Sequence, residues 1–178
     1  MWGNIRLQKL FGFHISGLLL AGFSLISNAA DLSEYKRLAQ HTIEIVQNGK
    51  VADIDKLIET QARLVQLGVD ACNDYARKHP KAKRVLELVT SNADMMKRLS
   101  LSEIEEKWHH GGELKKNGYE VKEDHFGAVG NLIDAVIHPA TTYIALTKYR
   151  TDNNPAHLEQ VVAELSEVLV HLQYLEDH

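Results

Sequence analysis

The sequence predicts an all-α protein: an antiparallel helical bundle of four main helices plus two shorter ones, after an N-terminal signal peptide. Apolar residues recur at steps of three and four along most of the chain, which is the spacing of one face of an α-helix. No alternating apolar and polar run competes as a β-strand. Helix-ending and helix-starting dipeptides separate the periodic segments, namely Asn48-Gly49, His79-Pro80 and Asn154-Pro155.

Residues 1–29 have the three parts of a secretory signal peptide. Arg6 and Lys9 give a basic start, an apolar stretch follows, and small residues precede the expected cleavage after Ala29. Cleavage after Ala30 is the close alternative. A second alternative is that the segment is not cleaved and stays as a membrane anchor, because the apolar stretch nears the ~18 residues that span a bilayer. Glycine and serine dilute that stretch, so we expect cleavage, no stable membrane insertion afterwards, and a periplasmic or secreted protein.

Residues 31–178 are long enough for a single helical-bundle domain with its own core. The formal charge of −4 becomes −6 once Arg6 and Lys9 leave with the leader, which has no acidic residue. A mildly acidic surface argues against nucleic acid as a partner. Cys72, the single cysteine, falls on an apolar stripe and is expected to be a buried thiol. Covalently attached haem is excluded because it needs a C-x-x-C-H run.

The boundaries follow from the apolar spacing and the helix caps. The four main helices are predicted at residues 32–48, 52–78, 126–149 and 155–175. Segments 82–99 and 102–111 are predicted to be helices that connect or cover them, the second beginning with a capping box from Ser102 to Glu105. Pro139 falls inside a main helix, where it removes one backbone hydrogen bond and should kink the helix.

The least generic stretch is Trp-His-His-Gly-Gly at residues 108–112. On a regular helix Glu105 lies one turn before His109, and Glu106 lies one turn before His110. Imidazoles and carboxylates are ligands of zinc, copper, nickel and iron. Adjacent histidines point about 100° apart on a helix, so both can bind one ion only where the helix ends. The glycine pair favours such an end.

A second candidate lies beside Pro139, where Asp134 and His138 are four residues apart on one helix face. Helix kinks in bundles often occur next to binding sites. We therefore expect any site to lie between the two stretches. Its candidate metal ligands are His109, His110, Glu106, Glu113, His125 and His138.

A structural interpretation of the same residues stays open. A glutamate four residues before a histidine is an ordinary stabilising pair, and a histidine near a helix end complements the helix dipole. No strict signature such as H-E-x-x-H is present. On the last helix His157, Glu164 and His171 recur every seven residues and are expected to border the core with solvated tips.

No catalytic motif occurs, so an enzyme is not indicated. The first hypothesis is an exported, non-enzymatic bundle that binds a small ligand or a transition metal such as zinc or copper. The alternative is a structural or interaction bundle without ligand, whose surfaces meet a protein partner or a second copy of the chain. A third hypothesis is non-covalent haem binding, with Met95, Met96, His41 and His171 as candidate axial residues.

Overall fold

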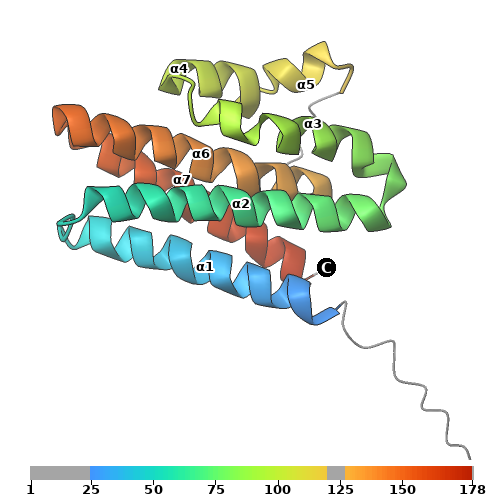
Figure 1. Cartoon of the computed structure of the whole chain (residues 1–178), viewed down its shortest axis with the longest axis horizontal. Helices are drawn as coiled ribbons and strands as arrows, with labels where there is room; N and C mark the ends of the chain where they lie inside the picture. Colours follow the sequence, from blue (N-terminus) through green and yellow to red (C-terminus); the bar gives the residue numbers. More distant parts are fainter. Residues whose placement is uncertain (1–24, 120–126, 178) are drawn as a thin grey trace, which may run out of the picture.

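The computed structural model confirms an all-α chain (Figure 1). It describes the backbone of residues 25–119 and 127–177 and the side chains of residues 32–119 and 127–175. Most of the predicted signal peptide therefore lies outside the described residues. The elements are α1 (Leu25–Gln47), α2 (Ile54–Lys78), α3 (Pro80–Met96), α4 (Leu101–Ile104), the π-helical turn η1 (Glu105–His109), α5 (Gly112–Lys116), α6 (Ala128–Asp152) and α7 (Ala156–Asp177).

The four long helices α1, α2, α6 and α7 contact one another in a ring: α1 with α2, α2 with α6, α6 with α7, and α7 with α1. Neighbours in this ring run in opposite directions (Figure 1). Helix α3 folds back along α2 and also contacts α6, and α4 packs on α6 as well. The segment that follows α3 is thereby brought against α6. Among the described helices, none is long and apolar enough to cross a membrane.

The segment predicted as one helix at 102–111 is instead divided between α4 and η1 and begins earlier. The capping box is formed by Ser100 and Glu103, not by Ser102 and Glu105. The Glu103 amide donates to Ser100 Oγ at 3.2 Å, and the Ser100 amide donates to the Glu103 carboxylate at 2.9 Å. The bonds from Ser100 and the nearby Lys107 lower the pKa of Glu103 to about 2. Both serines have a glutamate three residues later, so the pattern alone could not choose between them.

The carbonyl that Pro139 leaves without its helical donor is satisfied by a neighbouring helix. This carbonyl belongs to Ala135 of α6. The Tyr35 hydroxyl of α1 donates to it at 2.9 Å inside the core. Gly68 of α2 comes so near that a Cβ atom there would lie 2.3 Å from the same oxygen. Helices α1 and α2 are therefore both held against α6 one turn before the proline.

Cys72 of α2 is fully buried, as expected, and its Sγ lies 3.2 Å from the carbonyl oxygen of Leu132. Burial raises the pKa of the thiol to about 12. Because the thiolate is the reactive form, native protein at pH 8 should leave Cys72 unmodified by a thiol reagent over hours. Urea-unfolded protein should take up one equivalent within minutes. Comparable labelling rates for folded and unfolded protein would contradict this placement.

Candidate metal centre

One face of α6 is polar although it lies in the interior. Asn131, Asp134, His138 and Thr141 follow one another at steps of three, four and three residues, which puts them on successive turns of the same face. Three of the four are buried, and the fourth, Asp134, is largely covered. Burying polar groups costs free energy unless they are paired. Their partners come from η1 and α7.

His138 pairs with Glu164 of α7, and its Nδ1 donates to Glu164 Oε2 at 2.6 Å. Burial lowers the pKa of His138, but the hydrogen bond and charge of Glu164 outweigh it, so the pKa is raised overall. Burial acts to raise the pKa of Glu164, but the bond to His138 and the charges of His109 and His138 together lower it overall. Without metal, the two side chains therefore form a buried imidazolium–carboxylate pair.

His109 of η1 reaches the same pair from the other side. Its Nε2 lies 2.9 Å from Thr141 Oγ1 and 3.7 Å from Glu164 Oε2, and its ring centroid is 5.1 Å from that of His138. The Thr141 hydroxyl donates its proton to the Ile137 carbonyl, so it accepts from His109. Burial lowers the pKa of His109 overall. The neutral imidazole favoured in this way is the form that binds metals.

His171 of α7 completes the cluster on the opposite side of His138. Its Nδ1 donates to Asn131 Oδ1 at 2.8 Å and lies 3.4 Å from Asp134 Oδ2. Its ring stacks at 5.8 Å from the His138 ring. The side chains of Glu164 and His171 are each only 12% exposed. The expectation of solvated tips is therefore wrong for these two residues. Their tips turn toward α6, because the polar face of α6 offers them partners.

These side chains form two sets of donors that could hold a metal ion. One set is His109, His138 and Glu164, and the other is Asp134, His138 and His171. Within each set the donor atoms lie within 4.8 Å of one another. A tetrahedral zinc ion at 2.0–2.2 Å from nitrogen and oxygen donors puts those donors about 3.4 Å apart. Small movements would therefore close either set around an ion.

The predicted ligands His109 and His138 are brought together, whereas the neighbouring His110 is not. The His110 side chain is 70% exposed, and its Nε2 lies 3.2 Å from Glu105. The cause is the π-helical turn, in which the His110 amide donates to the carbonyl of Glu105 at 2.9 Å, five residues back. The pairs expected for a regular helix, Glu105 with His109 and Glu106 with His110, are thereby shifted by one residue. His109 is left free to face α6.

The remaining predicted ligands are elsewhere. Glu106 is exposed, and Glu113 forms an ion pair with Lys116 at 2.8 Å. His125 lies outside the described residues. The turn ends where the glycines predicted, because Gly111 takes a left-handed φ of 68°. This stop places His109 at the last position of η1.

Sequence reasoning left three members of the cluster out of the ligand set. They are Asp134, Glu164 and His171. The sequence pairs Asp134 with His138 on one helix face without making it a ligand, and it places Glu164 and His171 at the border of the core. The signal that could have found them is the polar stripe of α6. A stripe with steps of three and four requires polar partners on whichever helix packs over it.

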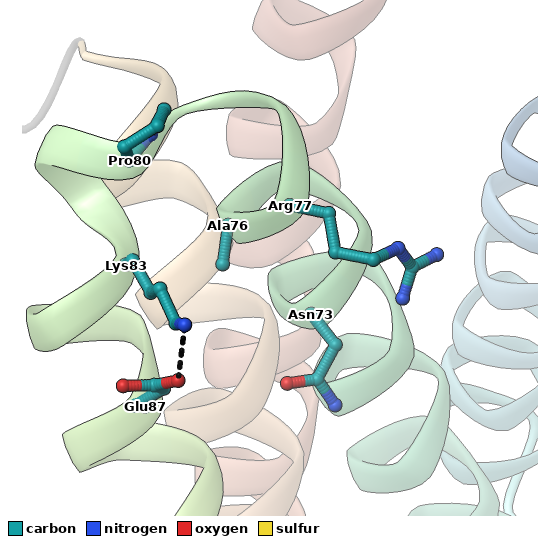
Figure 2. Close-up of a pocket in the computed structure, with 6 residues that line it drawn as sticks. All are labelled: Asn73, Ala76, Arg77, Pro80, Lys83 and Glu87. Carbon is teal, nitrogen blue, oxygen red and sulfur yellow. Dashed lines mark ion pairs between the residues drawn. The ribbon is translucent and has the colours of Figure 1, made fainter.

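A surface hollow of about 800 Å³ lies apart from this cluster, between α2 and α3. Figure 2 shows its lining residues, which are Asn73, Ala76, Arg77, Pro80, Lys83 and Glu87. Lys83 and Glu87 form an ion pair at 3.6 Å, and Arg77 is paired with Asp74. Each charged residue of its lining therefore already has an ion-pair partner, so the hollow presents fewer groups to a ligand than the histidine cluster does.

The candidate haem ligands are dispersed in the structure. His41 is exposed on α1, and Met95 is 55% exposed on α3. Met96 is buried in the core, and His171 is hydrogen bonded within the cluster. Facing axial residues around a flat cavity, which a haem would need, are not formed by these four.

Comparison of the chain with models of known protein families, with curated proteins and with solved structures gave no match. The functional interpretation therefore depends on the cluster itself: three imidazoles and two carboxylates, drawn from η1, α6 and α7.

Proposed function

We propose that this protein is an exported antiparallel helical bundle that binds a divalent transition metal ion through His109, His138 and Glu164. The convergence of these three donors from η1, α6 and α7 carries the proposal. Two imidazole nitrogens with one carboxylate oxygen suit zinc and copper, and three protein ligands leave a position open for a further ligand. Export is supported by the basic, apolar and small-residue pattern of residues 1–29.

The crowding of imidazoles favours a metal over a purely structural pair. One histidine is enough to neutralise Glu164, and His138 already does so at 2.6 Å. Yet the rings of His109 and His171 also come within 5.1 and 5.8 Å of the His138 ring. A second protonated ring this near to the first would set like charges against each other in a poorly solvated interior, and the charge of His138 contributes to the lowered pKa of His109. A metal ion that replaces the ring protons turns this crowding into favourable coordination.

The proposed ligands are also held in place by second partners. Thr141 Oγ1 contacts His109 Nε2 at 2.9 Å and is itself bonded to the Ile137 carbonyl. In the metal-free protein this bond holds the His109 ring with Nε2 beside Glu164, and an ion bound at Nε2 would displace its proton. Trp108, buried directly before His109, anchors η1 in the core. The His109 side chain is thus positioned by neighbours on both sides.

The adjacent histidines provide a matched test. His109→Ala should lower the affinity for zinc by more than about 100-fold, because even the loss of an outer partner costs 10–100-fold. His110→Ala removes the exposed side chain of the next residue and should change the affinity for zinc less than about twofold. Tag-free mature protein from the periplasm should carry near-stoichiometric metal by elemental analysis. A competition titration with a chromophoric chelator would measure the affinities.

Two results would contradict the proposal. Equal affinity in His109→Ala and His110→Ala would remove His109 from the ligand set. A wild-type protein that carries no metal and takes up neither zinc nor copper would leave a structural or partner-binding bundle. Helical circular dichroism of each variant would verify that the fold is retained.

A further inference from the structure

We propose that the protein holds a second metal ion of the same class on Asp134, His138 and His171, so that the centre is dinuclear and His138 belongs to both coordination sets. This inference depends on the proposed function and extends it. It starts from the shared member of the two donor sets: His138 stands between His109 with Glu164 on one side and Asp134 with His171 on the other.

One ion does not account for all the donors. With ligands at 2.0–2.3 Å, an ion can reach donor atoms that are at most about 4.6 Å apart. The donor atoms of each set lie within 4.8 Å of one another, close to that reach, but the five residues fall into two sets and not into one. An ion bound by His109, His138 and Glu164 would leave Asp134 and His171 facing each other at 3.4 Å beside it.

The two sets have the same composition. Each has one carboxylate, one imidazole of its own, and the shared imidazole of His138. An imidazole has two ring nitrogens, and each can bind a metal ion when its proton is displaced. His138 Nδ1 faces Glu164 at 2.6 Å, which leaves Nε2 for the second ion. Two carboxylates and one imidazolate, the form of His138 with neither ring nitrogen protonated, would offset three of the four charges that two divalent ions bring.

An independent observation points to an external ligand on the second ion. Asn131 is buried and accepts from His171 Nδ1 through its Oδ1 at 2.8 Å. Its buried Nδ2 has no hydrogen-bond partner in the described part of the chain. A buried donor without an acceptor is costly. A water or small anion coordinated to the second ion would supply that acceptor.

The stoichiometry of demetallated, tag-free mature protein titrated with zinc tests the inference. We expect two ions per chain, and one ion in His171→Ala and in the near-isosteric Asp134→Asn. The matched control is His157→Ala, which removes another partly buried histidine of α7, paired with Asp152 at 3.0 Å. It should keep two ions. Isothermal titration calorimetry and elemental analysis would count them.

The two proposals fail in different ways. One ion per chain, lost in His109→Ala and retained with unchanged affinity in His171→Ala, would overturn the second site and leave the first. No ion at all would overturn both. Loading with copper tests the bridge: ions linked through His138 should give a weaker electron paramagnetic resonance signal per copper than the single ion of His171→Ala. Two full, independent signals would overturn the shared ligand.

Discussion

Replacement of both His138 and Glu164 by leucine should abolish metal binding and leave the metal-free protein at least as stable as the unaltered chain. The two side chains are 4% and 12% exposed, so both charges have lost most of their hydration. Their attraction only partly repays that loss. Apolar substitution of a buried ion pair is often neutral or raises the free energy of unfolding by 1–4 kcal/mol. Urea unfolding of demetallated protein, followed by circular dichroism, would measure the change.

The single variants sharpen this experiment. His138→Leu leaves the Glu164 carboxylate buried without its main partner, and should lower the free energy of unfolding by about 3–5 kcal/mol. Glu164→Leu should cost less, because His138 can lose its proton and become neutral. The double variant should therefore be more stable than His138→Leu, a non-additive result expected for residues in contact. A double variant no more stable than His138→Leu would show that the pair of His138 and Glu164 stabilises the packing of α6 and α7. A structural role would then explain the pair, and the metal proposal would lose support.

The helices could be predicted because each one carries its own local signals. The apolar spacing and Asp53 cap of α2, and the Pro80 start of α3, act within a few residues of the chain. The division of 102–111 could not be predicted in the same way. Periodicity assumes 3.6 residues per turn, and the π-helical bond from His110 to Glu105 breaks that assumption. One extra residue in the turn decides which of two adjacent histidines faces the interior.

The candidate site was predicted only where it is local. His109 and His138 stood out by their sequence neighbours, Trp108 and Pro139. Glu164 and His171 do not stand out, because their spacing of seven residues is equally typical of a solvated helix border. Their role comes from the packing of α7 over the polar face of α6, which joins residues 26 and 40 positions apart. Such contacts depend on the arrangement of the helices and not on their periodicity.

The packing behind the site gives the other large expected effect. Gly68→Ala should lower the free energy of unfolding by about 1–3 kcal/mol, and the melting temperature by roughly 3–10 °C. The added Cβ would lie 2.3 Å from the Ala135 oxygen and 2.8 Å from its carbon. These are backbone atoms that cannot rotate away. The higher helix propensity of alanine stabilises a helix by up to about 1 kcal/mol relative to glycine. This gain is smaller than the cost expected from the overlap of the new Cβ with the Ala135 backbone. Thermal unfolding of the metal-free protein would measure it.

The same substitution should also weaken metal binding, although Gly68 belongs to neither donor set. Ala135 directly follows Asp134 and lies three residues before His138, so a displacement of its carbonyl moves both donors on α6. Gly127→Ala is the control, because no atom lies within 4 Å of a Cβ there. This control variant should lower the free energy of unfolding by at most about 1 kcal/mol and leave the affinity for metal unchanged. Equal stability of the two variants would show that α2 can move away from α6. The contact between Gly68 and Ala135 would then not determine the positions of Asp134 and His138.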